Sequence, residues 1–424
     1  MAIAAPAVAA AAAAAAAALT LAAFALRRRT HCPEVHGATT EWNSAVLAAC
    51  PSLTAPYSLP ALLSNPHFET ILAAVLRRKP HLMYARELLH LPDGGCVALD
   101  SEQVAAGAQP LPEDAPLLLL LPGLTGGSED GYVQHAVVRA RQAGMRAVVF
   151  NSRGTSGSPV LTAQFYSASF TGDLRMVVAH LRARHPRSML LAAGWSAGAN
   201  LLTRYLGEEG EQAPFAAAAT LCNPFSLVLS RVRLRRGFSR FYSWNLARSL
   251  KRILTQHKHL FDAEAAAPGG KPYRTDLALQ ATSIGDYDEA ITCVSFGWTD
   301  VLSYYAAGGS ADSISNIRVP LLIVQAANDP ISPLEAIPFE AIKANPACLL
   351  VLTPTGGHLG WCSGEGGVRG PPWTDGAVAD YFAAAVQLAK QPEYAAAAAL
   401  QHPAAAAAEP DGVFTMEQTV HQAP

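Results

Sequence analysis

The stretch MLLAAGWSAGANLLTRYLG, residues 189–207, decides the fold of this chain. Its first five residues are wholly apolar, which is typical of a strand buried on both faces of a sheet. Gly194-Trp195-Ser196-Ala197-Gly198 follows, and after it comes a helix-like segment. In a G-x-S-x-G pattern between a strand and a helix, a sharp turn exposes the serine hydroxyl, and Gly194 and Gly198 let the two elements approach closely. The pattern therefore predicts a nucleophile elbow at Ser196.

Further short apolar runs precede turn residues and helix-like stretches elsewhere in the chain. They cover residues 116–121, 147–150, 321–327 and 348–352. Buried strands that alternate with helices predict an α/β fold with a mostly parallel central sheet and helices on both of its faces. In such sheets ligands bind at the carboxyl ends of the strands, so the residues that follow each run are candidates for the site.

A serine nucleophile needs a base and an orienting carboxylate, which in this class of fold follow it in the order serine, acid, histidine. Asp329 comes directly after the run 321–327, and His358 lies in the loop after the run 348–352. We expect Asp329 to be the acid and His358 the base. The alternative for Asp329 is an Asx turn before the following proline. His67 and His135 are less favourable candidates for the base.

The oxyanion of a tetrahedral intermediate needs two N–H donors. The amide of Ala197, directly after the nucleophile, is expected to supply one. The glycine-rich loop PGLTGGS, residues 122–128, follows the first apolar run, and we expect the Leu124 amide to supply the other. A phosphate cradle is the alternative for this loop, but the lysine of a P-loop is absent.

Composition excludes several classes of protein. The 424 residues are 50% hydrophobic and 15% charged, with a formal net charge of -2. That composition is not that of a disordered or fibrous chain, and it provides no positive field for nucleic acid. The seven cysteines lie without C-x-x-C pairs, so we expect neither a metal site nor a disulfide framework, and no cofactor.

The two ends differ from the body. Residues 2–26 carry no charge and contain 17 alanines, and three arginines follow at 27–29. We expect residues 1–30 to be an apolar N-terminal segment that anchors the chain as a single pass in a membrane, with the body in the cytosol. A segment lying on the membrane surface, or a low-complexity tail, is the alternative. One domain is expected over 51–391, followed by a disordered alanine- and proline-rich tail over 392–424.

Several blocks carry a resemblance to a known family. They are NPHFETI (65–71), DGG (93–95), PGLTGGS (122–128), FNSRG (150–154), FYSA (165–168), DL (173–174), YDEA (287–290) and GGHLGW (356–361). On these blocks the chain resembles the AB hydrolase 4 family of the α/β-hydrolase superfamily. The resemblance implies a serine ester hydrolase that acts on acyl lipids such as monoacylglycerols, medium-chain esters or phospholipids. Acyl transfer to an alcohol, and a catalytically silent module that binds lipids, are the alternatives. Acyl chain length, head group and oligomeric state stay open.

One basic stretch bears on how substrate reaches the site. No acidic residue lies between Glu211 and Asp262, whereas arginines alternate there with aromatic residues. The stretch falls in a small cap expected at about 225–290, which we expect to lie against an anionic membrane surface. A solvated basic helix is the alternative. The arginines assigned to the membrane contact are Arg231, Arg233, Arg235, Arg236 and Arg240.

Overall fold

The computed structural model describes residues 25–103, 109–392 and 418–422, and a ten-stranded sheet forms its centre. The central strands are, in spatial order, β7 (Arg146–Asn151), β6 (Leu117–Leu121), β8 (Leu190–Trp195), β9 (Phe215–Leu221), β10 (Leu321–Ala326) and β11 (Cys348–Thr353). Each neighbouring pair among them runs parallel. The outer strands are antiparallel to their neighbours: β5 (Cys96–Glu102), β4 (Met83–His90) and β12 (Gln418–Gln422) at one end, and β2 (Glu34–Gly37) at the other.

The five apolar runs found in the sequence are all strands of this sheet, and the expected α/β fold with a mostly parallel sheet is confirmed. Strand β9 carried no such signal, because its sequence FAAAATL is rich in alanine and suits a buried helix as well as a strand. It is nevertheless buried along its whole length, between β8 and β10.

Helices cover both faces of the sheet, as expected, and the strands divide their side chains between them. Leu118 and Leu120 of β6 pack toward α4 (Gly131–Gln142) and α14 (Trp373–Leu388). The alternate residues of the same strand pack toward α5 (Gly172–Arg184), α6 (Ala197–Glu209) and α13 (Phe339–Ala344). This alternation is the two-residue period of a strand, with both faces buried.

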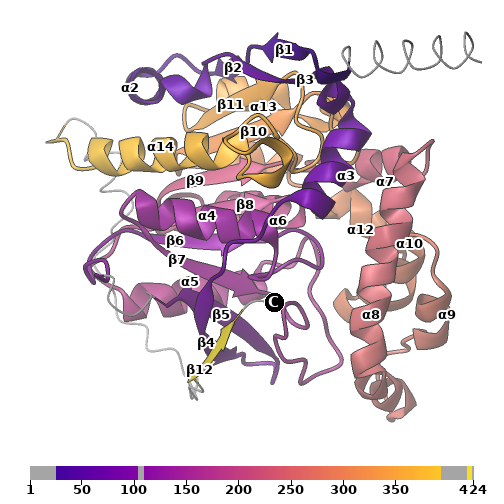
Figure 1. Ribbon diagram of the computed structural model, residues 1–424. Coiled ribbons are helices and arrows are strands. Elements are labelled where there is room, and N and C mark those ends of the chain that lie inside the picture. Colours follow the sequence, from indigo (N-terminus) through magenta and orange to yellow (C-terminus); the bar gives the residue numbers. More distant parts are fainter. Residues whose placement is uncertain (1–24, 104–108, 393–417, 423–424) are drawn as a thin grey trace, which may run out of the picture.

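A group of helices is inserted between β9 and β10. They are α7 (Leu227–Leu234), α8 (Ser239–Ala266), α9 (Thr275–Gln280), α10 (Ile284–Tyr287), a π-helical turn at Asp288–Thr292, α11 (Cys293–Phe296) and α12 (Val301–Gly308). Figure 1 shows α7 to α10 and α12 beside the sheet, at the right of the view. We call this group, from Leu227 to Gly308, the cap; it runs further than the range of about 225–290 expected from sequence. Its helices pack around an apolar core that includes Leu254 and Phe261 and is shared with Val160 and Phe165 of the body.

The N-terminal part of the structure lies at the end of the sheet formed by β11 and β2. Strand β1 (Arg28–His31) pairs antiparallel with β3 (Tyr57–Pro60), and two helices follow, α2 (Glu41–Ala49) and α3 (Pro66–Leu76). Helix α3 begins at Pro66, and the side chain of the preceding Asn65 caps it by accepting hydrogen bonds from the N–H groups of His67 and Phe68.

The structure describes only part of the two ends of the chain, so it tests the expectations for them only in part. Residues 1–24, which make up most of the expected membrane anchor, lie outside the described residues. Within the described ranges, no helix has the length and apolar character needed to span a bilayer. Of the C-terminal tail expected to be disordered, residues 393–417 and 423–424 lie outside the described residues, and Gln418–Gln422 forms β12. The edge strand β4 offers unpaired backbone groups there, and β12 satisfies them.

Candidate active site

Ser196 stands at the turn between β8 and α6. Its backbone has φ 53° and ψ -116°, a strained conformation for a residue with a side chain. A Cβ atom at Gly194 would lie 2.6 Å from the carbonyl oxygen of Gly198, and one at Gly198 would overlap that of Leu121. The turn therefore needs both glycines, as a nucleophile elbow requires.

The structure brings Ser196, His358 and Asp329 together in one chain of hydrogen bonds. Nε2 of His358 lies 2.9 Å from Oγ of Ser196, and Nδ1 lies 2.8 Å from Oδ2 of Asp329. The other oxygen of Asp329 accepts hydrogen bonds from the N–H groups of Ile331 and Ser332 at 2.7 and 2.9 Å. The Asx turn considered as an alternative is therefore present, but it uses Oδ1 and leaves Oδ2 for the histidine.

The two less favoured histidines have other partners. Nδ1 of His67 lies 3.1 Å from the hydroxyl of Tyr242, and Nε2 of His135 lies 2.8 Å from the carbonyl oxygen of Arg78. The imidazole that contacts Ser196 is that of His358.

Of the two expected oxyanion donors, Ala197 directly follows the serine, and Leu124 directly follows Gly123, at which a Cβ would lie 3.4 Å from that of Ser196. Leu124 and Ala197 both line the cavity that contains Ser196. Within the described part of the chain, neither backbone N–H donates a hydrogen bond, so both stay available for a ligand. The neighbouring Gly123 N–H is already used, because it donates to the hydroxyl of Tyr132 at 2.9 Å. The loop thus offers the Leu124 amide and not that of Gly123.

A cavity of about 650 Å³ opens at Ser196 and extends under the cap. Most of its wall is apolar, and the cap contributes side chains from α7, α8 and α10. These include Leu227, Leu234, Leu246, Leu250, Ile253 and Ile284. Such a volume and lining suit a ligand with an extended hydrocarbon part.

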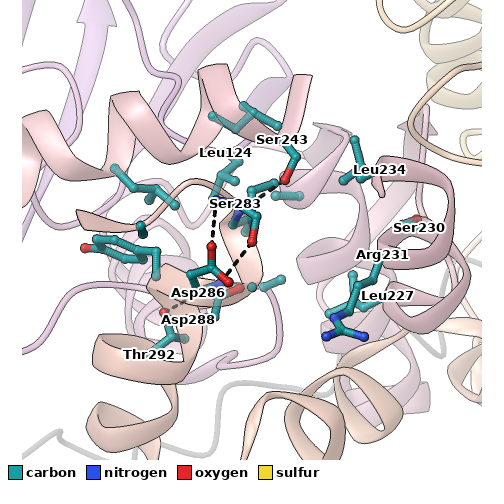
Figure 2. A pocket seen from close by; sticks show the side chains of 18 of the residues that line it. Leu124, Leu227, Ser230, Arg231, Leu234, Ser243, Ser283, Asp286, Asp288 and Thr292 are labelled. Carbon is teal, nitrogen blue, oxygen red and sulfur yellow. Dashed lines mark hydrogen bonds between the residues drawn. The ribbon is translucent and has the colours of Figure 1, made fainter. Parts of the chain in front are cut away.

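Several polar groups on the cap side of the cavity form hydrogen bonds with one another (Figure 2). Asp286 accepts a hydrogen bond from the Ser283 N–H at 3.0 Å and forms a capping box with Ser283, the N-cap of the short helix α10. The carboxylate of Asp288 accepts from the hydroxyls of Thr292 and Tyr305, both at 2.6 Å, and burial raises its pKa to about 6. Asp286 and Asp288 therefore stabilise the cap through hydrogen bonds with other residues of the cap.

Among the described residues, one cluster has the spacing of metal ligands: Cys222, Asp329 and His358. Its contacts are those of hydrogen-bonded side chains. The Cys222 sulfur accepts the N–H of Leu359 at 3.3 Å, and burial raises the pKa of the thiol well above its ordinary value. The expected absence of a metal stays a prediction.

Two residues that sequence reasoning did not assign to the site lie on α3. The hydroxyl of Thr70 accepts the N–H of His358 at 2.9 Å, and the carboxyl of Glu69 accepts that of Cys362 at 2.9 Å. Burial raises the pKa of Glu69 to about 7. Both residues belong to the block NPHFETI, so the signal was present in the sequence, but nothing in the block showed what it contacts.

Comparison with known proteins gives consistent relatives. A family model described as alpha/beta hydrolase fold matches residues 116–361. The embryogenesis-associated protein EMB8 of Picea glauca is 44% identical over 367 residues, which are 85% of this chain and 78% of that protein. Phospholipase ABHD3 of Mus musculus is 33% identical over 317 residues, 74% of this chain and 75% of that protein. Monoacylglycerol lipase of Saccharomyces cerevisiae is 34% identical over 257 residues, 60% of this chain and 56% of that protein.

The family model covers more than half of the chain, and it spans the elbow, the carboxylate and the histidine loop in a single match. The fold of the sheet, the place of Ser196 after β8 and these relatives agree. The chain belongs to the α/β-hydrolase fold family, as the resemblance of its sequence blocks predicts.

Proposed function

We propose that this protein is a serine carboxylic ester hydrolase that acts on acyl lipids, with Ser196 as nucleophile, His358 as general base and Asp329 as orienting acid. One observation carries the proposal: the hydrogen-bonded chain Asp329–His358–Ser196 ends at the wall of a large, mostly apolar cavity. The relatives named as phospholipase and monoacylglycerol lipase support the choice of lipid esters.

The geometry supports an acyl-enzyme mechanism. When Nδ1–H of His358 donates to Asp329, Nε2 is free to accept the proton of Ser196. The serine oxygen then attacks the ester carbonyl, and the amides of Leu124 and Ala197 hold the oxyanion. His358 returns the proton to the departing alcohol. Water, activated in turn by His358, releases the acid and restores the serine.

Labelling with a fluorophosphonate tests the nucleophile. The wild-type chain should be labelled, and Ser196→Ala should not. Ser315→Ala is the control, because Ser315 is exposed and its hydroxyl contacts only the neighbouring Asp312 carbonyl oxygen. Absence of labelling in the wild type, in detergent and with liposomes, would favour the silent lipid-binding module.

The substrate class is tested by turnover. Monoacylglycerols, lysophospholipids and p-nitrophenyl esters of increasing chain length should give an optimum at a chain that fills the cavity. A preference for acetyl esters in all three series would contradict an acyl-lipid substrate. Addition of ethanol to the same assays separates hydrolysis from acyl transfer, because only transfer yields an ethyl ester.

We propose in addition that the cap contacts an anionic membrane surface. Phe238, Phe241 and Trp244 are 52, 45 and 45% exposed at the start of α8. Arginines flank them in the sequence, and within the described residues only one of the five assigned to the membrane, Arg233, has an acidic partner, Glu335 at 3.6 Å. Exposed aromatic rings beside unpaired basic groups suit the interface of an anionic bilayer.

Charge reversal tests this contact. The double variant Arg235→Glu/Arg236→Glu should weaken binding to vesicles of anionic lipid by about tenfold or more. Lys343→Glu/Lys390→Glu is the control, since it makes the same change in charge at exposed positions outside the cap. Equal binding by both double variants would contradict the membrane contact.

The expected anchor at residues 2–26 stays a separate proposal, which rests on the sequence alone. Fractionation of cells that express the full chain, or the chain without these residues, tests it. The full chain should sediment with membranes and resist extraction with high salt, whereas the shortened chain should be released by salt. Identical behaviour of the two would contradict an anchor.

A further inference from the structure

The loop that carries His358 adopts an unusual backbone. It follows β11 and contains two residues with side chains in the left-handed region, Leu359 with φ 63° and Trp361 with φ 42°. Such conformations persist only where the surroundings over-determine them. The position of the imidazole therefore depends on what holds this loop.

Side chains of helix α3 accept hydrogen bonds from two N–H groups of this loop. The hydroxyl of Thr70 accepts the N–H of His358 itself, at 2.9 Å, and donates its own proton to the carbonyl oxygen of Pro66 at 2.7 Å. Because that proton is engaged within the helix, the lone pairs of the oxygen point away from it, toward the loop. One turn of helix thus presents a fixed acceptor to the backbone of the histidine.

The carboxyl of Glu69 supports the far end of the loop. It is 1% exposed, and Oε1 accepts the N–H of Cys362 at 2.9 Å. Arg77, at the end of the same helix, donates to the carbonyl oxygens of Leu359 and Gly360. Helix α3 therefore contacts the loop on both sides of its left-handed residues.

Two more side chains complete the set, and they come from the ends of neighbouring strands. Oδ1 of Asn328, beside the acid, accepts the N–H of Gly357 at 3.0 Å. The sulfur of Cys222, after β9, accepts the N–H of Leu359 at 3.3 Å. Of all these contacts, only the one from Thr70 reaches the backbone of the histidine.

We propose that Thr70 is a positioning residue for His358, whose hydroxyl fixes the backbone of the histidine so that its imidazole spans Ser196 and Asp329. The inference rests on the proposed function, since it concerns the same base. Thr70 does not contact the reacting atoms and acts only through His358. A loss of this acceptor should lower the rate of the chemical step and leave substrate binding nearly unchanged.

Two substitutions at one position test the proposal. Thr70→Val keeps the shape of the side chain and removes the acceptor, whereas Thr70→Ser keeps the hydroxyl. Thr70→Val should lower kcat by roughly 10- to 100-fold with KM within about twofold, because a small displacement of a catalytic group has effects of this size. Thr70→Ser should stay within about threefold of wild type. The rate of fluorophosphonate labelling should follow kcat.

Rates are divided by the folded fraction, measured by circular dichroism. Wild-type kcat in Thr70→Val, or an equal loss in Thr70→Ser, would overturn the proposal. If Thr70→Val does not fold, Thr70→Ala replaces it with the same expectation, and an unchanged kcat there overturns the proposal equally. If the wild-type chain is not labelled and turns over no ester, the proposed function falls and this inference with it. Labelling of wild type and Thr70→Val at equal rates removes this inference alone.

Discussion

The turn that carries Ser196 and the loop that carries His358 are held in different ways. At the serine, backbone packs against backbone, and the space around Gly194 and Gly198 leaves no room for a side chain. At the histidine, side chains from α3 and from two strand ends accept the N–H groups of the loop. A constraint between backbones leaves a short local pattern in the sequence, whereas a constraint between side chains is spread over distant positions.

The largest predicted effect is that of a substitution at Ser196, which should abolish activity and leave the stability of the elbow nearly unchanged. Ser196→Ala should lower kcat by about 10⁴-fold or more, since the nucleophile is removed. The free energy of unfolding should stay within about 1 kcal/mol of wild type, because the methyl group occupies the same turn. Ester turnover and urea unfolding of the same preparation measure both quantities. Substantial residual turnover would assign the nucleophile elsewhere.

Gly198→Ala tests whether backbone packing holds the elbow. The added methyl group would overlap the carbonyl oxygen of Leu121, so the free energy of unfolding should fall by about 3 kcal/mol, with loss of activity. Gly376→Ala in α14 is the matched control, because its Cβ would find only an ordinary contact at 3.8 Å from the Arg139 side chain. The control should be neutral or stabilising by about 0.5–1 kcal/mol. Similar urea midpoints for the two variants would contradict the packing argument.

Glu69→Gln tests the side-chain support of the histidine loop through pH. Burial raises the pKa of Glu69 to about 7, so the folded chain keeps this proton while the unfolded chain, at the ordinary pKa of 4.5, has lost it. The raised pKa of Glu69 contributes to the free energy of unfolding fully below about pH 4.5, and this contribution is lost as the pH rises toward 7. In all it is on the order of 3 kcal/mol.

Urea unfolding between pH 5 and 8 measures this effect. The stability of the wild-type chain relative to Glu69→Gln should decline across the range. The nearest charged group, Arg77, lowers the pKa of Glu69 and is present in both chains. Asp375, whose pKa burial also raises to about 7, is common to both and cancels in the difference. Parallel stability curves would show that Glu69 titrates normally.

The smallest predicted effect tests whether residues of the cap also help to position the histidine loop. Tyr242→Phe removes the hydroxyl that contacts His67 on α3, and Tyr273→Phe removes a hydroxyl of the cap that donates to Ala163 instead. Both should lower the free energy of unfolding by about 1 kcal/mol. Only Tyr242→Phe should lower kcat, by roughly twofold. Equal kcat values in the two variants would confine the support to α3 and the strand ends.

The same contrast explains what the sequence could predict. Ser196, Asp329 and His358 each follow an apolar run that became a strand, so their meeting at one sheet edge followed from the fold class. The residues that hold the histidine loop could not be predicted from the sequence. Thr70 lies 288 positions from His358, and nothing near either residue marks the contact between them. Strand β9 was missed because its alanines fit two kinds of element. The cap followed in outline, but its extent to Gly308 depends on how its helices pack together.

The cap leaves the sheet after β9 and returns to it at β10, and these two strands are neighbours. An insertion between adjacent strands can be lengthened or exchanged while the register of every strand stays the same. The cap, and with it the cavity that it lines, can therefore vary without a change in the strands that precede Ser196, Asp329 and His358. A new cap would have to reproduce contacts with the scaffold such as Tyr242–His67 and Phe261–Phe165.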